Sequence, residues 1–253
     1  MNPQSETATP PPLPPPLPQS LSEVERLTGV FFSPGKAFAD IARRPRWWIP
    51  ILLIGIVSTI YLNAYSSRVG FERIVRQTIE QSSRAESMSA QQREQAIAVG
   101  ASFARIAAYG GGIVNILIAI LIASAVLAFM VNNLMGGNLR FPSLMGIVSY
   151  AFLPQILVTA LSMLVMYQKA PDDFDLRNPL LFNAGALMPN DSAQWLKGLA
   201  GSFDLFSFWI IALIAIGISA AAPKIKFGKA LGAVLFPWAI YVALKTAYLA
   251  AFA

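Results

Sequence analysis

Long runs of apolar residues alternate along the chain with segments that carry most of its charges. Five runs have the length of about 20 residues that a helix, rising about 1.5 Å per residue, needs to cross roughly 30 Å of hydrocarbon. They lie at about 48–66, 106–132, 143–167, 205–222 and 229–252. The pattern therefore predicts an all-α, polytopic integral membrane protein, with the five spans packed as a transmembrane helix bundle.

Prolines interrupt two of the predicted spans, and these breaks matter for function. Pro154 lies in the middle of the third span, and Pro237 lies in the fifth. Proline removes a backbone N–H donor and so breaks or kinks a helix. Because broken helices can form solute sites in transporters, the two prolines mark candidate breaks.

The segment between the first two spans, residues 67–102, has a helical pattern of its own. An apolar stripe recurs at the spacing of one helical face, made by Phe71, Ile74, Val75, Thr78 and Ile79. A second helix starts at Ser89, with Gln92 three residues later, as in a capping box. We predict a helical hairpin or two interfacial helices outside the bilayer core. The stripe is expected to cover the end of the bundle, and a partner-binding role is the alternative.

The chain before the first span divides into two parts. Residues 1–20 hold eight of the eighteen prolines, which predicts a disordered or polyproline II tail. We interpret it as a solvated tether, with a PxxP ligand as the alternative. Residues 21–46 form a juxtamembrane segment, in which one helix precedes a break at residues 33–35. A second short helix follows, with an apolar face made by Ala37, Phe38, Ile41 and Ala42.

Composition supports the membrane interpretation. Charged residues make up 13% of the chain, against about 25% in a soluble domain, and the mean hydropathy is +0.55. The net charge of +6 would suggest nucleic-acid binding in a soluble protein. In a membrane protein the same excess reflects Lys and Arg residues that fix the topology. We therefore expect the lipid bilayer as a partner and no nucleic acid.

The placement of basic residues predicts the orientation. Lys and Arg residues divide evenly between the two sides of a five-span topology, but the rule weighs charges in short loops and close to span ends. The run RRPR at 43–46 touches the first span, and KIKFGK at 224–229 fills the turn between the fourth and fifth. The opposing charges lie mostly in the long loops 67–102 and 169–204; we expect the latter to be solvated. The predicted location is the cytoplasmic (inner) membrane, with the N-terminus cytoplasmic and the C-terminus outside.

The residue types exclude much catalytic chemistry. The chain contains no Cys and no His, so thiolate nucleophiles, Cys/His zinc sites and imidazole acid/base catalysis are excluded. We predict no catalytic, metal or cofactor site. Intramembrane polar residues are scarce: Asn115 is suited to hydrogen bonding between helices, and Lys245 is expected to reach the outer interface and meet the terminal carboxylate. Asp204 lies at the mouth of the fourth span.

The residues around the start of the first span form a membrane anchor. The sequence RRPRWWIP at 43–50 places Arg43, Arg44 and Arg46 before Trp47 and Trp48, directly ahead of an apolar run. Arginines suit anionic headgroups, at about 1 kcal/mol each near the surface, and tryptophans suit the interface. Pro50 is tolerated because first-turn amides have no intrahelical partner.

Two motifs resemble a known family. The segment FFSPGKAFADIARRPRWWIP, which includes Phe32, Pro34 and Gly35, is followed by a span, and GIVSYAFLP carries Gly146, Tyr150 and Pro154 in the third span. Their order and spacing over about residues 27–253 resemble the Yip (Ypt/Rab-interacting protein) domain family, especially its bacterial-type members. The resemblance implies a five-helix membrane protein with a cytosolic N-terminus.

For eukaryotic members, the resemblance implies binding of Rab-type GTPases, reticulon-like partners and roles in vesicle traffic. Here FFSPG stands in place of their acidic, tyrosine-containing stretch, so the resemblance gives little support for Rab-type GTPase binding by this chain. We expect a non-enzymatic scaffold or membrane-organising, trafficking-type protein with an unknown membrane-protein partner. The alternatives are a small-solute transporter or accessory permease subunit, and a membrane-shaping protein that acts through residues 67–102.

Overall fold

The computed structural model describes residues 20–80, 82, 87–171, 174, 179–189 and 192–252. In these ranges the chain is helical, and its only β pairing is an isolated bridge between Asn183 and Asp204. The prediction of an all-α fold is confirmed. The proline-rich tail, apart from residue 20, and the acidic stretch at 172–173 and 175 lie outside the described residues.

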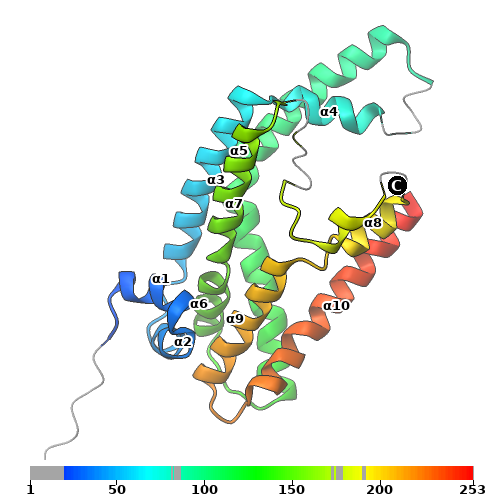
Figure 1. Ribbon diagram of the computed structural model, residues 1–253. Helices are drawn as coiled ribbons and strands as arrows, with labels where there is room; N and C mark the ends of the chain where they lie inside the picture. The colour runs from blue at the N-terminus through cyan, green and yellow to red at the C-terminus, as the bar shows by residue number, and fades with distance from the viewer. Residues whose placement is uncertain are drawn as a thin grey trace, which may run out of the picture.

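The helices follow one another along the chain in the order shown in Figure 1. Their bounds are α1 Glu23–Phe32, α2 Pro34–Arg43, α3 Trp48–Arg68, α4 Phe71–Glu80, α5 Ala90–Ala128, the π-helix η2 Phe129–Leu134, α6 Phe141–Ala151, α7 Pro154–Gln168, the 3-10 helix η4 Ala184–Leu187, α8 Gln194–Ala200, α9 Leu205–Ala221 and α10 Phe227–Phe252.

Four helical segments are long and apolar enough to cross a membrane, namely Trp48–Arg68, Ala90–Leu134, Phe141–Gln168 and Phe227–Ala251. A fifth apolar helix, α9, has 17 residues, which is the lower limit for crossing the hydrocarbon. The chain is therefore a multi-pass membrane protein built as an all-α bundle. The count of five passes depends on α9.

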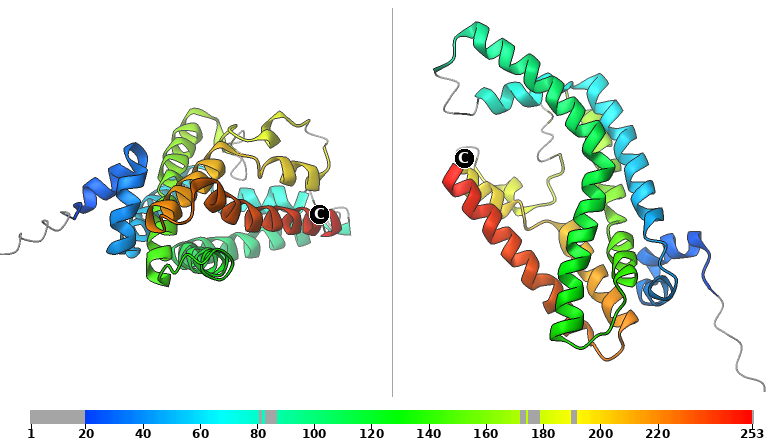
Figure 2. Two further views of the ribbon diagram at one scale, coloured as in Figure 1. Left: turned by 90° about the horizontal axis from the view of Figure 1, so that it is seen from below. Right: turned by 180° about the vertical axis from the view of Figure 1, so that it is seen from behind.

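The bundle has two distinct ends. At one end, which we call the basal end, α1 and α2 lie beside α6 and α9, and the start of α10 lies at the same end of the bundle (Figures 1 and 2). At the other, the distal end, lie α4, α8 and the C-terminus (Figure 1). The first two helices and the end of α10 thus lie at opposite ends of the bundle (Figure 1).

The second pass differs from the prediction, because α5 and η2 form one continuous segment of 45 residues. The helix starts at the predicted capping box, where the Ser89 hydroxyl accepts from the Gln92 N–H at 3.2 Å. No proline interrupts the run that follows, so the helix continues from the loop into the span. The prediction of a separate second interfacial helix is wrong, whereas the hairpin with α4 is present.

The arms of this hairpin pack closely at the distal end. A Cβ atom on Gly100 of α5 would lie 2.6 Å from Cγ1 of Val75 in α4. Arg76 and Glu94 form an exposed ion pair across the hairpin at 2.8 Å. The apolar stripe of α4 therefore covers the start of α5.

The prolines act differently in the two passes that contain them. The third pass breaks at residues 152–153, and Pro154 occupies the first turn of α7, where its missing N–H costs little. The fifth pass is not interrupted: α10 continues through Pro237. The predicted break at Pro154 is confirmed, and the one at Pro237 is wrong.

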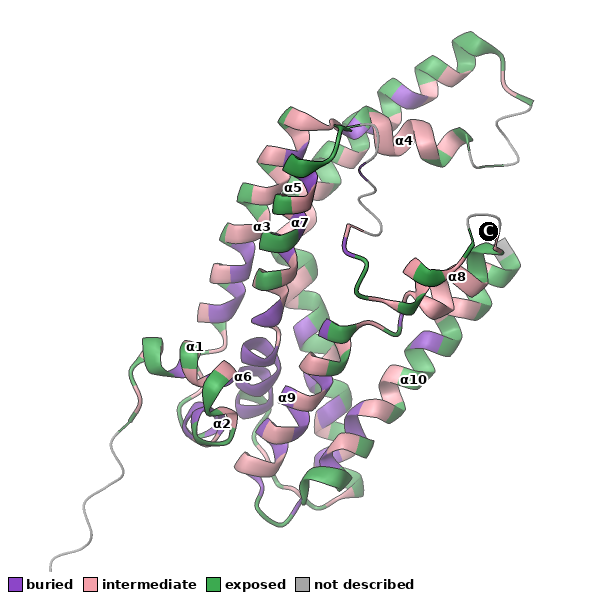
Figure 3. Cartoon of the chain, viewed as in Figure 1, coloured by how far each residue is buried: buried purple, intermediate pink, exposed green. Residues whose placement is uncertain are grey.

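Buried residues concentrate at the basal end, around α2, α6 and α9 (Figure 3). A smaller cluster lies at the distal end, made by Tyr65, Phe71, Ala101, Met166 and Phe174. Many large apolar side chains on α3, α5, α7 and α10 are exposed. So much exposed apolar surface is typical of helices that face lipid. The core therefore lies where the juxtamembrane helices meet the bundle.

Candidate functional site: a buried polar junction at the basal end

Local sequence signals build the two juxtamembrane helices. Ser22 caps α1, and its backbone N–H donates to Oε2 of Glu25 at 2.7 Å, which completes a capping box. Pro34 lies in the first turn of α2, where its fixed φ favours a helix. The predicted apolar face of α2, from Ala37 to Ala42, is buried against α6 and α9. The juxtamembrane segment is thus part of the folded core.

A buried arginine joins α1 to α2. Nη2 of Arg26 lies 2.7 Å from Oδ2 of Asp40, and its Nη1 lies 2.8 Å from Oε1 of Glu23. Nη1 also donates to the carbonyl oxygen of Arg44 at 3.2 Å. The Arg26 side chain is 2% exposed, and a charge so buried requires partners. Burial alone would lower the pKa of Arg26, but the hydrogen bond to Asp40 and the attraction of Glu23 outweigh it and raise the pKa.

Glu23 extends this network to the bundle. Its Oε2 accepts a hydrogen bond from the Tyr150 hydroxyl of α6 at 2.7 Å. Its Oε1 also pairs with Nη1 of Arg46 at 3.1 Å. One carboxylate therefore connects both family-like motifs, since Arg46 belongs to the first and Tyr150 to the second.

Small residues allow the close approach of these elements. A Cβ atom on Gly146 would lie 3.1 Å from both Cγ2 of Ile41 and Cβ of Pro45. Ser143, one turn earlier, donates from its hydroxyl to the carbonyl oxygen of Ala42 at 2.7 Å. On α9, a Cβ at Gly217 would meet the Phe38 ring at 3.2 Å. We call this assembly of Glu23, Arg26, Asp40, Arg46, Gly146 and Tyr150 the basal junction.

The other residues of the first motif lie around the basal junction. Trp47 packs against the core and Pro50 is buried. Phe32 is 85% exposed, Trp48 is 50% exposed, and Gly35, Arg43 and Arg44 are also exposed. The first motif therefore combines a packed part with an apolar and basic surface.

The other site residues predicted from the sequence lie outside the basal junction. Asn115 is exposed on α5. Pro154 starts α7, beyond the junction. Lys245 donates from Nζ to the Gly198 carbonyl oxygen at 3.2 Å and to the Ser202 hydroxyl at 3.0 Å. It thus ties α10 to α8 at the distal end, whereas the terminal carboxylate that was its expected partner lies outside the described residues.

Sequence reasoning missed Glu23, Arg26 and Asp40 as partners in one network. A signal was available, because Asp40 interrupts the apolar face of α2 and Arg26 lies one turn before the buried Val30. A charge on an apolar helix face indicates either a buried pair or an error in the assigned face. The partners themselves come from different helices, so spacing alone could not identify them.

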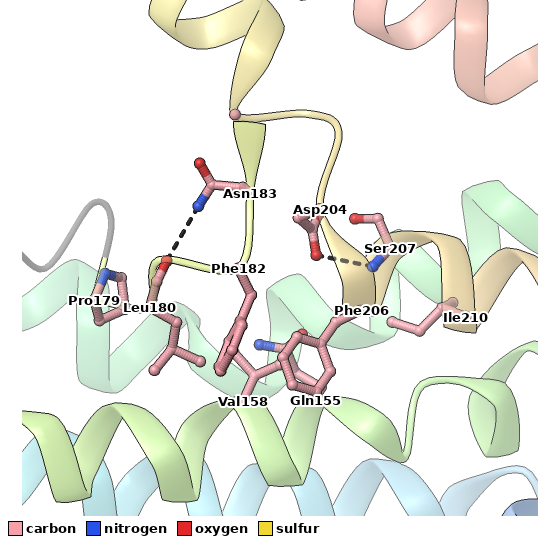
Figure 4. A pocket seen from close by; sticks show the side chains of 11 residues that line it. Gln155, Val158, Pro179, Leu180, Phe182, Asn183, Asp204, Phe206, Ser207 and Ile210 are labelled. Carbon is pink, nitrogen blue, oxygen red and sulfur yellow. Dashed lines mark hydrogen bonds between the residues drawn. The ribbon is translucent and has the colours of Figure 1, made fainter. Parts of the chain in front are cut away.

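A small cavity lies near the break of the third pass. It has a volume of about 240 Å³, and its polar lining includes Gln155, Asn183, Asp204 and Ser207 (Figure 4). Asp204 accepts from the Ser207 N–H at 2.9 Å as the cap of α9, and Asn183 accepts from the Ala186 N–H at 3.0 Å. The predicted solvated loop 169–204 is therefore partly wrong, because it contains η4 and α8 and forms one wall of this cavity.

The junction has the chemistry of a structural clamp. Its charged groups are paired with one another, and its hydroxyl is engaged with a carboxylate. Among the residues that the structure describes, no group of three or more acidic side chains could hold a metal ion. The arrangement can hold two helices rigidly against a membrane bundle.

The comparison with family models gives one match. The model described as Yip1 domain matches residues 28–248, a range that includes most of the basal junction and extends from α1 into α10. No curated protein and no solved structure matches the chain significantly.

Proposed function

Because the chain belongs to the Yip1 domain family, we propose that it is a non-enzymatic scaffold that organises other membrane proteins through its basal end. The observation that carries this proposal is the basal junction. A buried ion pair joins α1 to α2, and the hydrogen bond from Tyr150 to Glu23 attaches α1 to the bundle, so that the two helices form a rigid platform instead of a flexible tether. Such a platform presents one defined surface to a partner.

The exposed side of the platform has the character of a docking surface. Val24 and Phe32 are both largely exposed on α1, and Lys36 of α2 is exposed close by in sequence. Phenylalanine is enriched in protein–protein interfaces, so an exposed Phe32, on the same helix as Val24, suits a protein partner. Rab-type GTPases are not among the partners we propose, since FFSPG replaces the stretch associated with them.

The proposed orientation places the basal end in the cytoplasm, at the inner membrane. Arg43, Arg44, Arg46, Lys224 and Lys226 are exposed at this end, in short segments close to the ends of the passes. Basic residues in such positions are retained on the cytoplasmic side.

Crosslinking in native membranes, followed by mass spectrometry, tests the scaffold role. Photoreactive groups at positions 24 and 32 should capture a membrane protein reproducibly, and a group at the exposed position 187 of the distal end should not. Capture of the same proteins from both ends, or from neither, would overturn the proposal. A flux assay with the purified protein in proteoliposomes is the complementary test, since robust substrate-dependent transport would contradict a scaffold.

The cavity near Pro154 supports a small-solute transporter as the second candidate, because solute sites occur where transmembrane helices are discontinuous. Gln155 is half-buried in its wall. If the protein transports a solute, Gln155→Leu should reduce flux at least about tenfold while the protein remains folded. Unchanged flux in that variant would remove this cavity from consideration.

The distal hairpin supports membrane shaping as a third candidate. The part of α5 that extends beyond the bundle exposes Val99, Phe103 and Ile106, which could insert into the lipid interface. Replacing all three by serine should abolish the deformation of liposomes if this role is correct. The matched control replaces three other exposed leucines by serine and so removes a comparable apolar surface. These are Leu181, Leu187 and Leu244.

A further inference from the structure

A second cavity lies at the basal end, and none of the residues that line it belongs to the Arg26 network. It has a volume of about 450 Å³ and lies between the end of α2, the start of α6 and the end of α9. Alanines, among them Ala39 and Ala220, line much of it, so the space exists because the side chains there are small. Its volume is typical of a site for a small ligand.

The charged side chains that line this cavity are all basic. Two guanidinium groups line it, Arg43 from α2 and Arg140 from the start of α6, together with Asn138 and Ser143. No carboxylate is among its lining residues. Within the described ranges, neither arginine forms an ion pair, in contrast to Arg26 and Arg46. Asp40, the carboxylate of α2, is engaged by Arg26.

The cavity also lies at the level where headgroups are found. α6 begins and α9 ends at its rim, and the side chain of Trp48 is exposed at the start of α3, at the same end of the bundle. Tryptophan is enriched at the membrane interface. Lys224 and Lys226 follow the lining residue Pro223 and are exposed. The cavity thus has basic groups beside apolar walls at the end of the hydrocarbon region.

We propose that this cavity binds the phosphate of an anionic glycerophospholipid, held by Arg43 and Arg140. Arginine binds phosphate oxygens through charge-assisted, often bidentate hydrogen bonds. Nε of Arg43 already donates to the Ala39 carbonyl oxygen at 3.1 Å, which orients the side chain and leaves its two terminal nitrogens available. The apolar walls and the interfacial level favour a lipid over a free phosphate.

A bound lipid would contact three parts of the chain that are distant in sequence. The lining residues come from α2, from the start of α6 with the connection before it, and from the end of α9 with the turn after it. Anything that binds the folded state alone stabilises it by mass action. The lipid would therefore reinforce the attachment of α2 to the bundle, next to the basal junction.

The test measures the thermal unfolding midpoint of the full chain in detergent micelles doped with dioleoyl phosphatidylglycerol. Inorganic phosphate is one separate arm. The other is the zwitterionic lipid dioleoyl phosphatidylcholine, whose phosphate is accompanied by a cationic choline group that the two arginines would repel. Phosphatidylglycerol should raise the midpoint in a saturable way, whereas phosphatidylcholine and phosphate should not. The double variant Arg43→Gln/Arg140→Gln should bind phosphatidylglycerol at least about tenfold more weakly.

A matched control variant has the same net charge as Arg43→Gln/Arg140→Gln. Lys36→Gln/Lys229→Gln removes two exposed basic groups from the same end without touching the cavity, and its affinity should stay within about twofold of the parent protein. An equal loss of affinity for phosphatidylglycerol in both double variants, or no loss in either, would overturn the proposed site. Equal binding of inorganic phosphate would overturn the assignment to a lipid. If Arg43→Gln/Arg140→Gln does not fold, the single variant Arg140→Gln must still weaken the binding of phosphatidylglycerol for the proposal to stand.

Discussion

The hydroxyl of Tyr150 donates a hydrogen bond to Oε2 of Glu23 at 2.7 Å, across 127 positions of sequence. This contact joins the third pass to the first helix of the chain. Glu23 also binds Arg26 and Arg46, so the bond completes a network and does not stand alone. The helices before the first span are therefore integral to the fold.

Removing this hydroxyl should weaken the basal junction. Tyr150→Phe leaves one oxygen of Glu23 without its donor in a largely buried setting, and a hydrogen bond to a charged group contributes about 1.5–3 kcal/mol. For a chain of this size, 1 kcal/mol corresponds to about 2–4 °C in the unfolding midpoint. We expect a fall of several degrees in detergent. Tyr241→Phe, at an exposed position of α10, should leave the midpoint unchanged, and equal shifts in both would contradict the prediction.

Truncating Arg26 should be more damaging, because it leaves Asp40 buried without a partner. Breaking a buried ion pair on one side costs about 3–5 kcal/mol, so Arg26→Ala should fold poorly or lose the docking of α1. Limited proteolysis of the N-terminal segment measures this directly. Arg76→Ala removes the exposed ion pair with Glu94 and should produce no measurable change.

A compensating variant separates the ion pair from a general defect at this position. In Arg26→Met/Asp40→Leu neither charge remains unpaired, and apolar replacement of a buried pair is often neutral. We expect this double variant to recover much of the stability that Arg26→Ala loses. If it is no more stable than Arg26→Ala, the unpaired Asp40 is not the cause of the damage.

The parts of the fold that sequence could predict are those that local patterns determine. The buried face of α2, the capping box at Ser89 and the break at Pro154 follow from side chains within one or two turns of each feature. The Arg26–Asp40 pair and the Tyr150–Glu23 bond depend on how helices pack against each other, so no local period reveals them. The continuity of α5 was also missed, because Arg105, which precedes the predicted start of the second span, does not end a helix.

The distinction between local patterns and contacts between packed helices also applies to the two motifs. The sequence predicts a membrane anchor and a family signature from their residues, and this prediction leaves out the contacts that Arg46 and Gly146 make in the basal junction. Those two residues matter because the motifs contact each other. Only the assembled structure shows this, since the first motif ends more than ninety residues before the second begins.

The two motif glycines should respond differently to substitution. Gly146→Val places carbon atoms against Ile41 and Pro45, whose nearest carbons would be only 3.1 Å from the new Cβ atom, and overpacking of this kind costs about 1–3 kcal/mol. Gly35 has open space around it, so Gly35→Ala should be neutral or slightly stabilising. Thermal midpoints of the two variants provide the comparison, and a harmless Gly146→Val would show that α2 can move away from α6.

Lys245 should control the attachment of α8. Its Nζ is bound to the Gly198 carbonyl oxygen and the Ser202 hydroxyl, and losing hydrogen bonds from a charged donor costs about 1.5–3 kcal/mol. Lys245→Ala should therefore increase amide hydrogen exchange in residues 194–200 by at least about tenfold, without changing exchange in α2. Lys229→Ala, at an exposed site of the same helix, should alter neither region. Uniform exchange changes across the chain would contradict a local tether.

The proposed orientation can be tested with single cysteines, because the chain has none of its own. Gln194→Cys lies at the distal end and Lys224→Cys at the basal end, and both positions are exposed. A membrane-impermeant maleimide should label Gln194→Cys in intact cells and label Lys224→Cys only after the inner membrane is permeabilised, since basic turns stay cytoplasmic. The reverse pattern would invert the orientation. Labelling of both positions from the same side would show that α9 does not cross the membrane as the fourth pass.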